Sequence, residues 1–229
     1  HRCERALGFY RTPKHPRMIN LTNEDNMELM KRYPDNYFEL AIVDPPYGIN
    51  ESENKDFGKK IKNSATKKTN YSKKKWDSST PNDEYFLELQ RVSKNQIIWG
   101  VNNYDFNFSS GRIFWNKNVP KEFYSSSKGE IAFKSFNKSI DLVKITWNGM
   151  IQHDMKNKEI RIHPTQKPVK LYEWLLMNYA KEGDKILDTH LGSGSIALAC
   201  HNLGYDLEGY ELDKEYYSNA LKRLKEICV

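Results

Sequence analysis

The stretch KILDTHLGSGSIALAC, residues 185–200, has the pattern of a β-strand, a tight glycine turn and an α-helix in direct succession. Gly192 and Gly194 let the backbone pass close to a ligand. The helix beyond them offers free N–H groups to a negative group such as a carboxylate. Because Gly-Ser-Gly turns join strands to helices in many proteins, the stretch alone predicts an α/β unit and does not identify a ligand.

The strand that follows this unit favours a nucleoside ligand. In DLEGYELD, residues 206–213, Glu211 stands at the carboxyl end of the strand, 17 residues after Gly194. An acid at this position can accept both hydroxyls of a ribose; the alternative is that Glu211 only starts the next helix. No third glycine follows Gly194, and there is no Walker lysine. We therefore expect a cofactor without phosphates, and S-adenosylmethionine fits that description.

Strand and helix patterns alternate through the rest of the chain. The predicted strands cover 17–21, 37–43, 96–101, 111–116, 130–136, 185–188 and 206–211. The predicted helices cover 26–33, 82–92, 168–180, 195–203 and 214–227, whereas residues 137–162 show little periodicity. This alternation predicts a doubly wound, Rossmann-like α/β sheet that is mostly parallel, with one antiparallel strand.

Composition sets the size and class of the protein. The 229 residues are 38% hydrophobic, with a mean hydropathy of −0.82, which suits one large α/β domain or two small ones. Met18 reads like a natural start, so we treat residues 1–17 as an N-terminal extension and 18–229 as a single domain. No run approaches the roughly 20 apolar residues that span a bilayer. The three cysteines share no C-x-x-C spacing, so we expect reduced thiols, no metal site and a cytoplasmic location.

The positive charge is concentrated in one segment. The net charge is +6, yet residues 55–75 alone hold nine lysines and one acid, or +8. Residues 50–76 lack apolar periodicity and are predicted to form a mobile loop that contacts a polyanion; the alternative is a solvated lysine loop. The lysines with this predicted role are Lys59, Lys60, Lys62, Lys67, Lys68, Lys73, Lys74 and Lys75.

A second motif follows the strand predicted at 37–43. The stretch AIVDPPYGIN, residues 41–50, leads from apolar residues into Asp44, Pro45, Pro46 and Tyr47. The prolines fix φ and donate no backbone hydrogen bond, so the carbonyl directions in this turn are set. Alone, the tetrapeptide is equally compatible with a turn that ends a strand, with Asp44 acting as a cap.

Three motifs together resemble one enzyme family. DPPY at 44–47, HPTQKP at 163–168 and LDTHLGSGS at 187–195, in that order, resemble the β class of DNA amino-methyltransferases. These enzymes use S-adenosylmethionine to methylate exocyclic amines of DNA bases, and the resemblance extends over roughly residues 18–227. The catalytic motif precedes the cofactor motif, a circularly permuted order that defines the class. GRIFWNKN and GEIAFKSF also resemble the strand motifs between them.

The resemblance implies a role for each matching residue. Asp44, Pro45, Pro46 and Tyr47 match the catalytic motif. The cofactor-binding residues that it implies are Asp188, His190, Gly192, Ser193 and Gly194 in the turn, Glu211 at the ribose, Asp25 at the adenine amine, and Thr165 and Lys167 at the methionine end. The chain departs from the family locally, because Glu24 stands where Gly is usual and His190 replaces an aromatic residue that packs beside the cofactor.

The chemistry implied is methylation of an amine on a base taken out of the duplex. The amine of adenine is a poor nucleophile because its lone pair is delocalised into the ring. The Asp44 carboxylate and the Pro45 carbonyl would accept its two N–H groups, and Tyr47 would stack on the base. N4-cytosine enzymes often carry Ser where Asp44 stands, which favours N6-adenine over N4-cytosine. A non-catalytic DNA-binding or cofactor-sensing module is the other alternative, and the intact motifs argue against it.

The resemblance also implies partners and a region that reads the DNA sequence. Double-stranded DNA is the expected partner, in a bacterial nucleoid or phage setting and away from membranes. A second copy of the chain and a cognate restriction endonuclease are further candidates, although no dimer face is evident. Residues 117–162 are the candidate target-recognition region, with Lys121, Lys138, Lys144, Gln152, His153 and Lys156 available for contacts.

Overall fold

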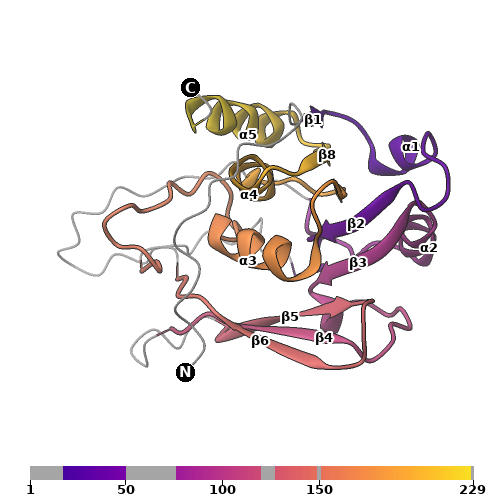
Figure 1. Cartoon of the computed structure of the whole chain (residues 1–229), viewed down its shortest axis with the longest axis horizontal. Helices are drawn as coiled ribbons and strands as arrows, with labels where there is room; N and C mark the ends of the chain where they lie inside the picture. Colours follow the sequence, from indigo (N-terminus) through magenta and orange to yellow (C-terminus); the bar gives the residue numbers. More distant parts are fainter. Residues whose placement is uncertain (1–17, 50–75, 120–126, 149–150, 228–229) are drawn as a thin grey trace.

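The computed structural model describes residues 18–49, 76–119, 127–148 and 151–227 (Figure 1). The predicted extension 1–17 lies outside these ranges. All eight lysines predicted to bind DNA lie outside them too, as does nearly all of the predicted loop at 50–76.

One sheet of eight strands organises the described residues, in the order β1-β8-β7-β2-β3-β5-β4-β6. All neighbouring strands pair in parallel except around β5, which runs antiparallel to both β3 and β4. The predicted sheet, mostly parallel with one reversed strand, is therefore confirmed. Its strands are β1 (Ile19–Thr22), β2 (Phe38–Val43), β3 (Ser93–Trp99), β4 (Arg112–Asn116), β5 (Gly129–Lys134), β6 (Ile140–Lys144), β7 (Lys185–Asp188) and β8 (Asp206–Tyr210).

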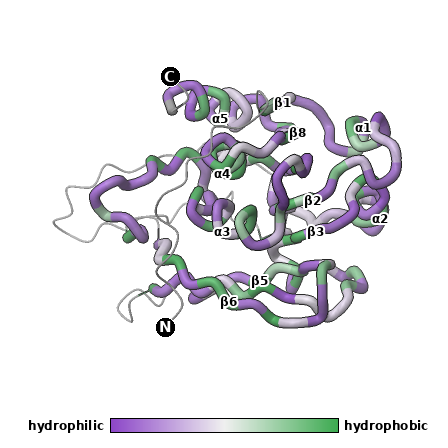
Figure 2. Tube along the Cα trace, in the orientation of Figure 1, coloured by the Kyte–Doolittle hydropathy of each residue, from purple (hydrophilic) through white to green (hydrophobic). Residues whose placement is uncertain are grey.

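Helices cover both faces of the sheet. On one face α1 (Asn26–Met30) and α2 (Asp83–Val92) pack in a core with Phe38 and Ile98. On the other face lie α3 (Val169–Tyr179), α4 (Ser195–Leu203) and α5 (Lys214–Ile227), as Figure 1 shows. Apolar segments line the strands between these two layers (Figure 2). This arrangement is the doubly wound architecture expected from alternating strands and helices.

Local sequence explains the central elements. Five of the six residues of β2 are buried, which suits a strand with parallel neighbours on both sides and helices on both faces. The amphipathic helix α2 buries Tyr85, Phe86, Leu89 and Val92 along one side. Its N-cap is Asn82, whose side chain accepts a hydrogen bond from the Tyr85 backbone N–H at 3.1 Å.

The strand β6 lies within residues 137–162, where the sequence shows little periodicity. It pairs with β4 alone and forms one edge of the sheet. Its pattern was not evident because apolar residues stand on both of its faces: Ile140 and Leu142 are 74% and 65% exposed, whereas Val143 is buried. A strand at the edge that exposes apolar side chains does not show the alternation by which strands are recognised.

The sheet brings the predicted site together at one edge. In parallel strands the carboxyl ends lie at the same edge, and ligands of doubly wound folds bind there. Asp44 follows β2, Gly100 follows β3 and Asp188 ends β7, so all three lie at this edge. Because β5 is reversed, its first residues lie there as well. Among the described residues, no helix is long and apolar enough to cross a membrane.

Candidate active site

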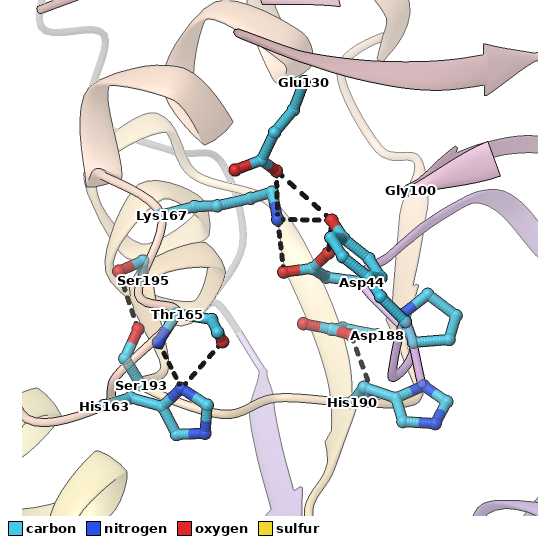
Figure 3. Close-up of polar contacts among 12 residues, drawn as sticks. Asp44, Gly100, Glu130, His163, Thr165, Lys167, Asp188, His190, Ser193 and Ser195 are labelled. Carbon is cyan, nitrogen blue, oxygen red and sulfur yellow. Dashed lines mark hydrogen bonds and ion pairs between the residues drawn. The ribbon is translucent and has the colours of Figure 1, made fainter. Parts of the chain in front are cut away.

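The Asp44 carboxylate is the centre of the site. Its Oδ1 accepts a hydrogen bond from the Tyr47 hydroxyl at 2.6 Å, and its Oδ2 lies 2.5 Å from the Lys167 ammonium (Figure 3). Two backbone N–H groups, those of Tyr47 and Gly48, donate to the Asp77 carboxylate at 2.8 and 2.9 Å. Asp77 therefore fixes the turn that carries Tyr47.

Lys167 lies in the acidic group around Asp44. Its side chain is 3% exposed and points into this group, and its implied contact with the methionine end of the cofactor stays a prediction. Its ammonium lies 2.9 Å from Glu130 Oε2 and 3.0 Å from the Tyr47 hydroxyl. The same ammonium lies 5.5 Å from the centre of the Trp99 ring, within the range of a cation–π interaction.

Two further charged residues join this group, and sequence reasoning assigned neither of them a role. Glu130, near the start of β5, pairs through Oε1 with the Lys117 ammonium at 2.6 Å. Asp44, Lys167, Glu130 and Lys117 thus form a chain of alternating charges, which we call the charge cluster. Glu130 and Lys117 stand in the GEIAFKSF and GRIFWNKN motifs, where charged residues within apolar strands were the available signal.

Burial and charge set the protonation of the cluster. Burial raises the pKa of Asp44, and the positive charge of Lys167 opposes the rise. Burial also acts to raise the pKa of Glu130, but the charges of Lys167 and Lys117 outweigh it and lower the pKa to about 2. For Lys167, the charges of the two acids outweigh burial and raise its pKa. At neutral pH Glu130 and Lys167 therefore stay charged, and Asp44 is the cluster's more readily protonated carboxylate.

The backbone beside Asp44 is held by aromatic residues. The Tyr104 hydroxyl donates to the Pro45 carbonyl at 2.8 Å. Gly100 has φ +72°, and a Cβ added there would lie 2.1 Å from Cε1 of Tyr47. The ring of Tyr47 therefore packs directly on the Gly100 backbone, and only glycine leaves room for it.

The glycine turn, residues 188–195, lies next to Asp44. Gly192 and Gly194 have φ of +53° and +71°, as a tight turn between strand and helix requires. A Cβ on Gly194 would lie 3.1 Å from that of Ala220, so α5 packs closely against the turn. On Gly192 a Cβ would lie 3.8 Å from the His190 carbonyl oxygen and 3.9 Å from the His163 ring, at van der Waals distance, so it would fit without a clash.

The two acids expected to hold the cofactor are oriented by backbone groups. Glu211 Oε2 accepts from the Gly192 N–H at 2.8 Å, and its Oε1 accepts from the Asp213 N–H at 2.9 Å. Asp25 is the N-cap of α1, and its Oδ1 accepts from the Met27 N–H at 2.8 Å. The Glu211 carboxylate is thereby fixed beside the glycine turn, and the Asp25 carboxylate is fixed at the start of α1.

Of the other turn residues predicted to bind the cofactor, Ser193 and Asp188 are buried and His190 is partly buried. The Ser193 hydroxyl lies 3.0 Å from that of Ser195. Asp188 Oδ1 accepts from the His190 N–H at 2.9 Å; burial raises the pKa of Asp188 to about 8, and the charge of Asp44 adds to the rise. Burial lowers the pKa of His190 to about 4, so its ring is neutral and lies edge-on to Tyr85, with centroids 5.3 Å apart.

The HPTQKP segment touches both parts of the site. The ring of its His163 lies 3.9 Å from where a Cβ on Gly192 would stand, and Thr165 Oγ1 lies 3.1 Å from His163 Nδ1. Lys167, two residues further on, belongs to the charge cluster. Thr165 therefore lies next to His163, near the glycine turn, and its implied contact with the methionine end stays a prediction.

The candidate recognition region is partly described. Gln152, expected to be available for contacts, is buried. Its side-chain Nε2 donates to the Glu159 carbonyl at 2.9 Å, and its Oε1 accepts from the Glu159 N–H at 2.7 Å. It closes the loop 152–159 and is thereby withdrawn from the surface, which corrects that prediction. His153 and Lys156 in this loop are exposed.

Comparison with known families gives one matching model, described as DNA methylase, over residues 52–222. That range holds Glu130, Lys167 and the glycine turn and begins after Tyr47. The chain is 28% identical to the Type II methyltransferase M2.DpnII of Streptococcus pneumoniae over 150 residues, which cover 66% of this chain and 49% of that protein. It is 24% identical to M2.MboI of Moraxella bovis over 91% of this chain and 88% of that protein.

Solved structures share the fold. A complex of M1.HpyAVI with SAM superposes with a TM-score of 0.54 at 21% identity, covering 90% of this chain and all (100%) of that one. The cytosine-N4-specific PvuII DNA methyltransferase gives a TM-score of 0.55 at 14% identity, covering 96% and 95% of the two chains. The alignments to the relatives M2.DpnII and M2.LlaDCHI span about half of those proteins, 49% in each case.

Proposed function

The chain belongs to the DNA methylase family, and on that premise we propose that it transfers a methyl group from S-adenosylmethionine to the N6 amine of an adenine turned out of DNA. The observation that carries the proposal is the partly buried Asp44 carboxylate, which lies near Asp188 of the glycine turn and is held by Tyr47 and Lys167. The reaction needs a carboxylate that accepts a hydrogen bond from the target amine, and this carboxylate must lie beside a glycine turn that binds a nucleoside cofactor.

The glycine turn fits S-adenosylmethionine. Gly192 and Gly194 both have positive φ, and the Gly192 N–H is bonded to Glu211, the acid expected at the ribose. Glu211 would hold the ribose, Asp25 the adenine amine and Thr165 the methionine end. A carboxylate has about four acceptor sites, so Glu211 can keep its two backbone donors and still accept hydroxyls. When bound, this cofactor supplies a methyl group on a positively charged sulfur.

Asp44 and Pro45 would hold the target amine. Two acceptors on its N–H groups draw the nitrogen toward pyramidal geometry, so that the lone pair points out of the ring plane. The Pro45 carbonyl already accepts from Tyr104, and its second lone pair is the one offered to the amine. Asp44 also stabilises the positive charge that develops on nitrogen. Because burial raises its pKa, Asp44 is suited to take the amine proton on Oδ1 or Oδ2 after transfer.

The DNA would contact the surface on the same side of the sheet edge. The lysines of 59–75 follow the catalytic motif directly in the chain and supply charge for phosphates, which give affinity without sequence information. The exposed part of loop 152–159, with His153 and Lys156, remains a candidate for contacts to bases. We further infer a single domain over 18–229, with residues 117–162 as the recognition region; a dimer and a restriction endonuclease partner stay predictions.

A direct test is to express the chain in a host that lacks DNA methylation and to measure modified nucleosides by mass spectrometry. We expect N6-methyladenine, and single-molecule sequencing of the same DNA would give the recognition site. N4-methylcytosine instead would overturn the assignment to adenine. Neither base, together with intact binding of S-adenosylmethionine, would favour a non-catalytic module.

The variant Asp44→Ala tests the mechanism in the same assay. Removing the acceptor that faces the developing charge should lower turnover by about 10²–10³-fold or more. Binding of S-adenosylmethionine, measured by calorimetry, should survive because the carboxylates that would hold it are elsewhere. Turnover equal to that of the wild type would exclude Asp44 as the acceptor.

A further inference from the structure

The charge cluster contains more than methyl transfer requires. The proposed reaction uses Asp44, yet the carboxylate is linked through Lys167 to Glu130 and on to Lys117, with separations of 2.5, 2.9 and 2.6 Å. Two acids and two lysines give a net charge of zero. The side chains are 3–19% exposed, so bulk water does little to screen these charges.

The fold fixes the four groups from separate elements. In the antiparallel pair of β4 and β5, Trp115 lies opposite Glu130. Lys117 is two residues beyond Trp115 and therefore faces the same side of the sheet, where its ammonium pairs with Glu130. Asp44 comes from the end of β2, and Lys167 from the segment before α3. The reversed direction of β5 is what brings Glu130 to the carboxyl edge.

The indole rings of two tryptophans lie close to the ammonium groups of the two lysines. The Lys117 ammonium lies 5.2 Å from the Trp115 ring, and that of Lys167 lies 5.5 Å from the Trp99 ring. The two indoles meet edge to face, with centroids 6.1 Å apart. Aromatic faces attract cations, and both rings are fully buried, so the two ammonium groups are held at set positions.

Sharing Lys167 between two acids matters for the acceptor. If Lys167 paired with Asp44 alone, its whole charge would act on that carboxylate and weaken it as an acceptor for the amine. Glu130 takes part of this charge, and Lys117 in turn keeps Glu130 ionised. Asp44 then retains negative potential where the methylated nitrogen becomes positive. Removing one member would leave a buried charge without its balance, which is costly.

We propose that Glu130, held by Lys117, is a positioning residue for methyl transfer that divides the charge of Lys167 and so keeps Asp44 an effective acceptor. Glu130 acts through Lys167 and touches neither cofactor nor base. This inference rests on the proposed function, because it assigns Glu130 a part in that reaction.

The test compares Glu130→Gln, Lys117→Met and the double variant with the wild type in steady-state methylation of DNA. Glu130→Gln leaves two lysines on one acid, and kcat should fall by about 10–100-fold. KM for DNA and Kd for S-adenosylmethionine should stay within about 3-fold, because the proposal gives Glu130 no contact with either ligand. Lys117→Met should lower kcat less, by about 3–10-fold.

The double variant gives the readout that a structural role would not produce. Removing Lys117 from the Glu130→Gln protein takes away the surplus positive charge, so kcat should recover by about 3–10-fold over the single variant, a non-additive result. The matched control is Glu39→Gln, which removes a paired glutamate, 3.0 Å from Lys94, at the other end of β2. Its kcat should equal that of the wild type.

Three outcomes overturn the proposal. The first is a wild-type kcat for Glu130→Gln. The second is a loss that comes with weaker cofactor binding and a lower Tm and that deepens in the double variant, as expected of a fold defect. The third is a wild-type chain that methylates no DNA, which defeats the proposed function as well. In the first two cases wild-type methylation persists and only the role of Glu130 is lost.

Discussion

The charge cluster and the glycine turn lie at the same edge of the sheet, yet they are held in different ways. The cluster consists of side chains that are far apart in the sequence, such as Asp44 and Lys167, 123 residues apart. The turn is local, and it is shaped by backbone: two glycines with positive φ and the Gly192 N–H bonded to Glu211. In the cluster buried charge is matched by opposite charge, whereas in the turn Asp188 is buried without a lysine at bonding distance among the described residues.

This difference separates two functions that a single site must combine. A site made of balanced charges is suited to respond to charge that appears on the substrate, because its groups are already fixed. A site shaped by backbone is suited to bind a molecule of a set outline. We therefore expect changes in the cluster to alter turnover and changes in the turn to alter cofactor affinity.

The largest effect that separates the two regions is expected from Gly100→Ala. The added Cβ would lie 2.1 Å from the Tyr47 ring, so the ring must move and its hydroxyl leaves Asp44. We expect kcat to fall by about 10²-fold, as for loss of a donor at a reacting centre, with Kd for S-adenosylmethionine nearly unchanged. Stopped-flow methylation and calorimetry measure the two quantities.

Gly183→Ala is the control for backbone strain. Gly183 has φ +90°, so alanine is strained there as well, but a Cβ would meet nothing within 4 Å. Both variants should lose about 1–2 kcal/mol of stability from the positive φ. Equal turnover in the two variants would show that the Tyr47 contact is unimportant.

An intermediate effect, in the opposite region, is expected from Glu211→Gln. A neutral amide forms weaker hydrogen bonds than a carboxylate by about 1 kcal/mol, so Kd for S-adenosylmethionine should rise about 5–10-fold. At saturating cofactor, kcat should stay within about 2-fold of the wild type. A reduced kcat with unchanged Kd would place Glu211 with the reacting groups and remove the distinction between the regions.

The smallest effect concerns pH and the buried Asp188. Its pKa of about 8 lies above the unfolded value of about 4, so the folded protein binds the extra proton between these values. Stability therefore falls as pH rises through this window. His190, with a pKa of about 4, acts in the opposite direction only below about pH 6.5, where the unfolded histidine is charged.

The variant Asp188→Asn should remove the fall in unfolding free energy that the wild type shows as the pH rises above 6.5. Between pH 6.5 and 8 we expect the wild type to lose on the order of 1–2 kcal/mol more unfolding free energy than the variant does. Urea titrations at several pH values give both curves. Parallel curves would mean that Asp188 is ionised throughout, as Glu130 is with its two lysines.

The sequence predicted the local half of this site better than the distant half. The elements β7, α4 and α5 have the predicted bounds because strand, glycine turn and helix each leave a pattern within ten to fifteen residues. The cluster leaves no such pattern, because Asp44 and Lys167 are 123 residues apart and no spacing rule links them. The resemblance implies a cofactor role for Lys167 and gives no sign of its contacts with Asp44 and Glu130. Charges that pair across a sheet are visible only once strand order is known.

The short distance between Thr165 and Lys167 has a consequence for the evolution of the site. Two residues of extended chain reach about 7 Å at most, so the segment limits how far apart its contacts to the turn and to the cluster can lie. A single residue inserted there would lengthen this segment. It would change the distance between the glycine turn, which would hold the methyl donor, and Asp44, which would hold the target amine, while leaving both motifs intact. Insertions should therefore accumulate in the loops on either side of residues 163–168 and spare the segment itself.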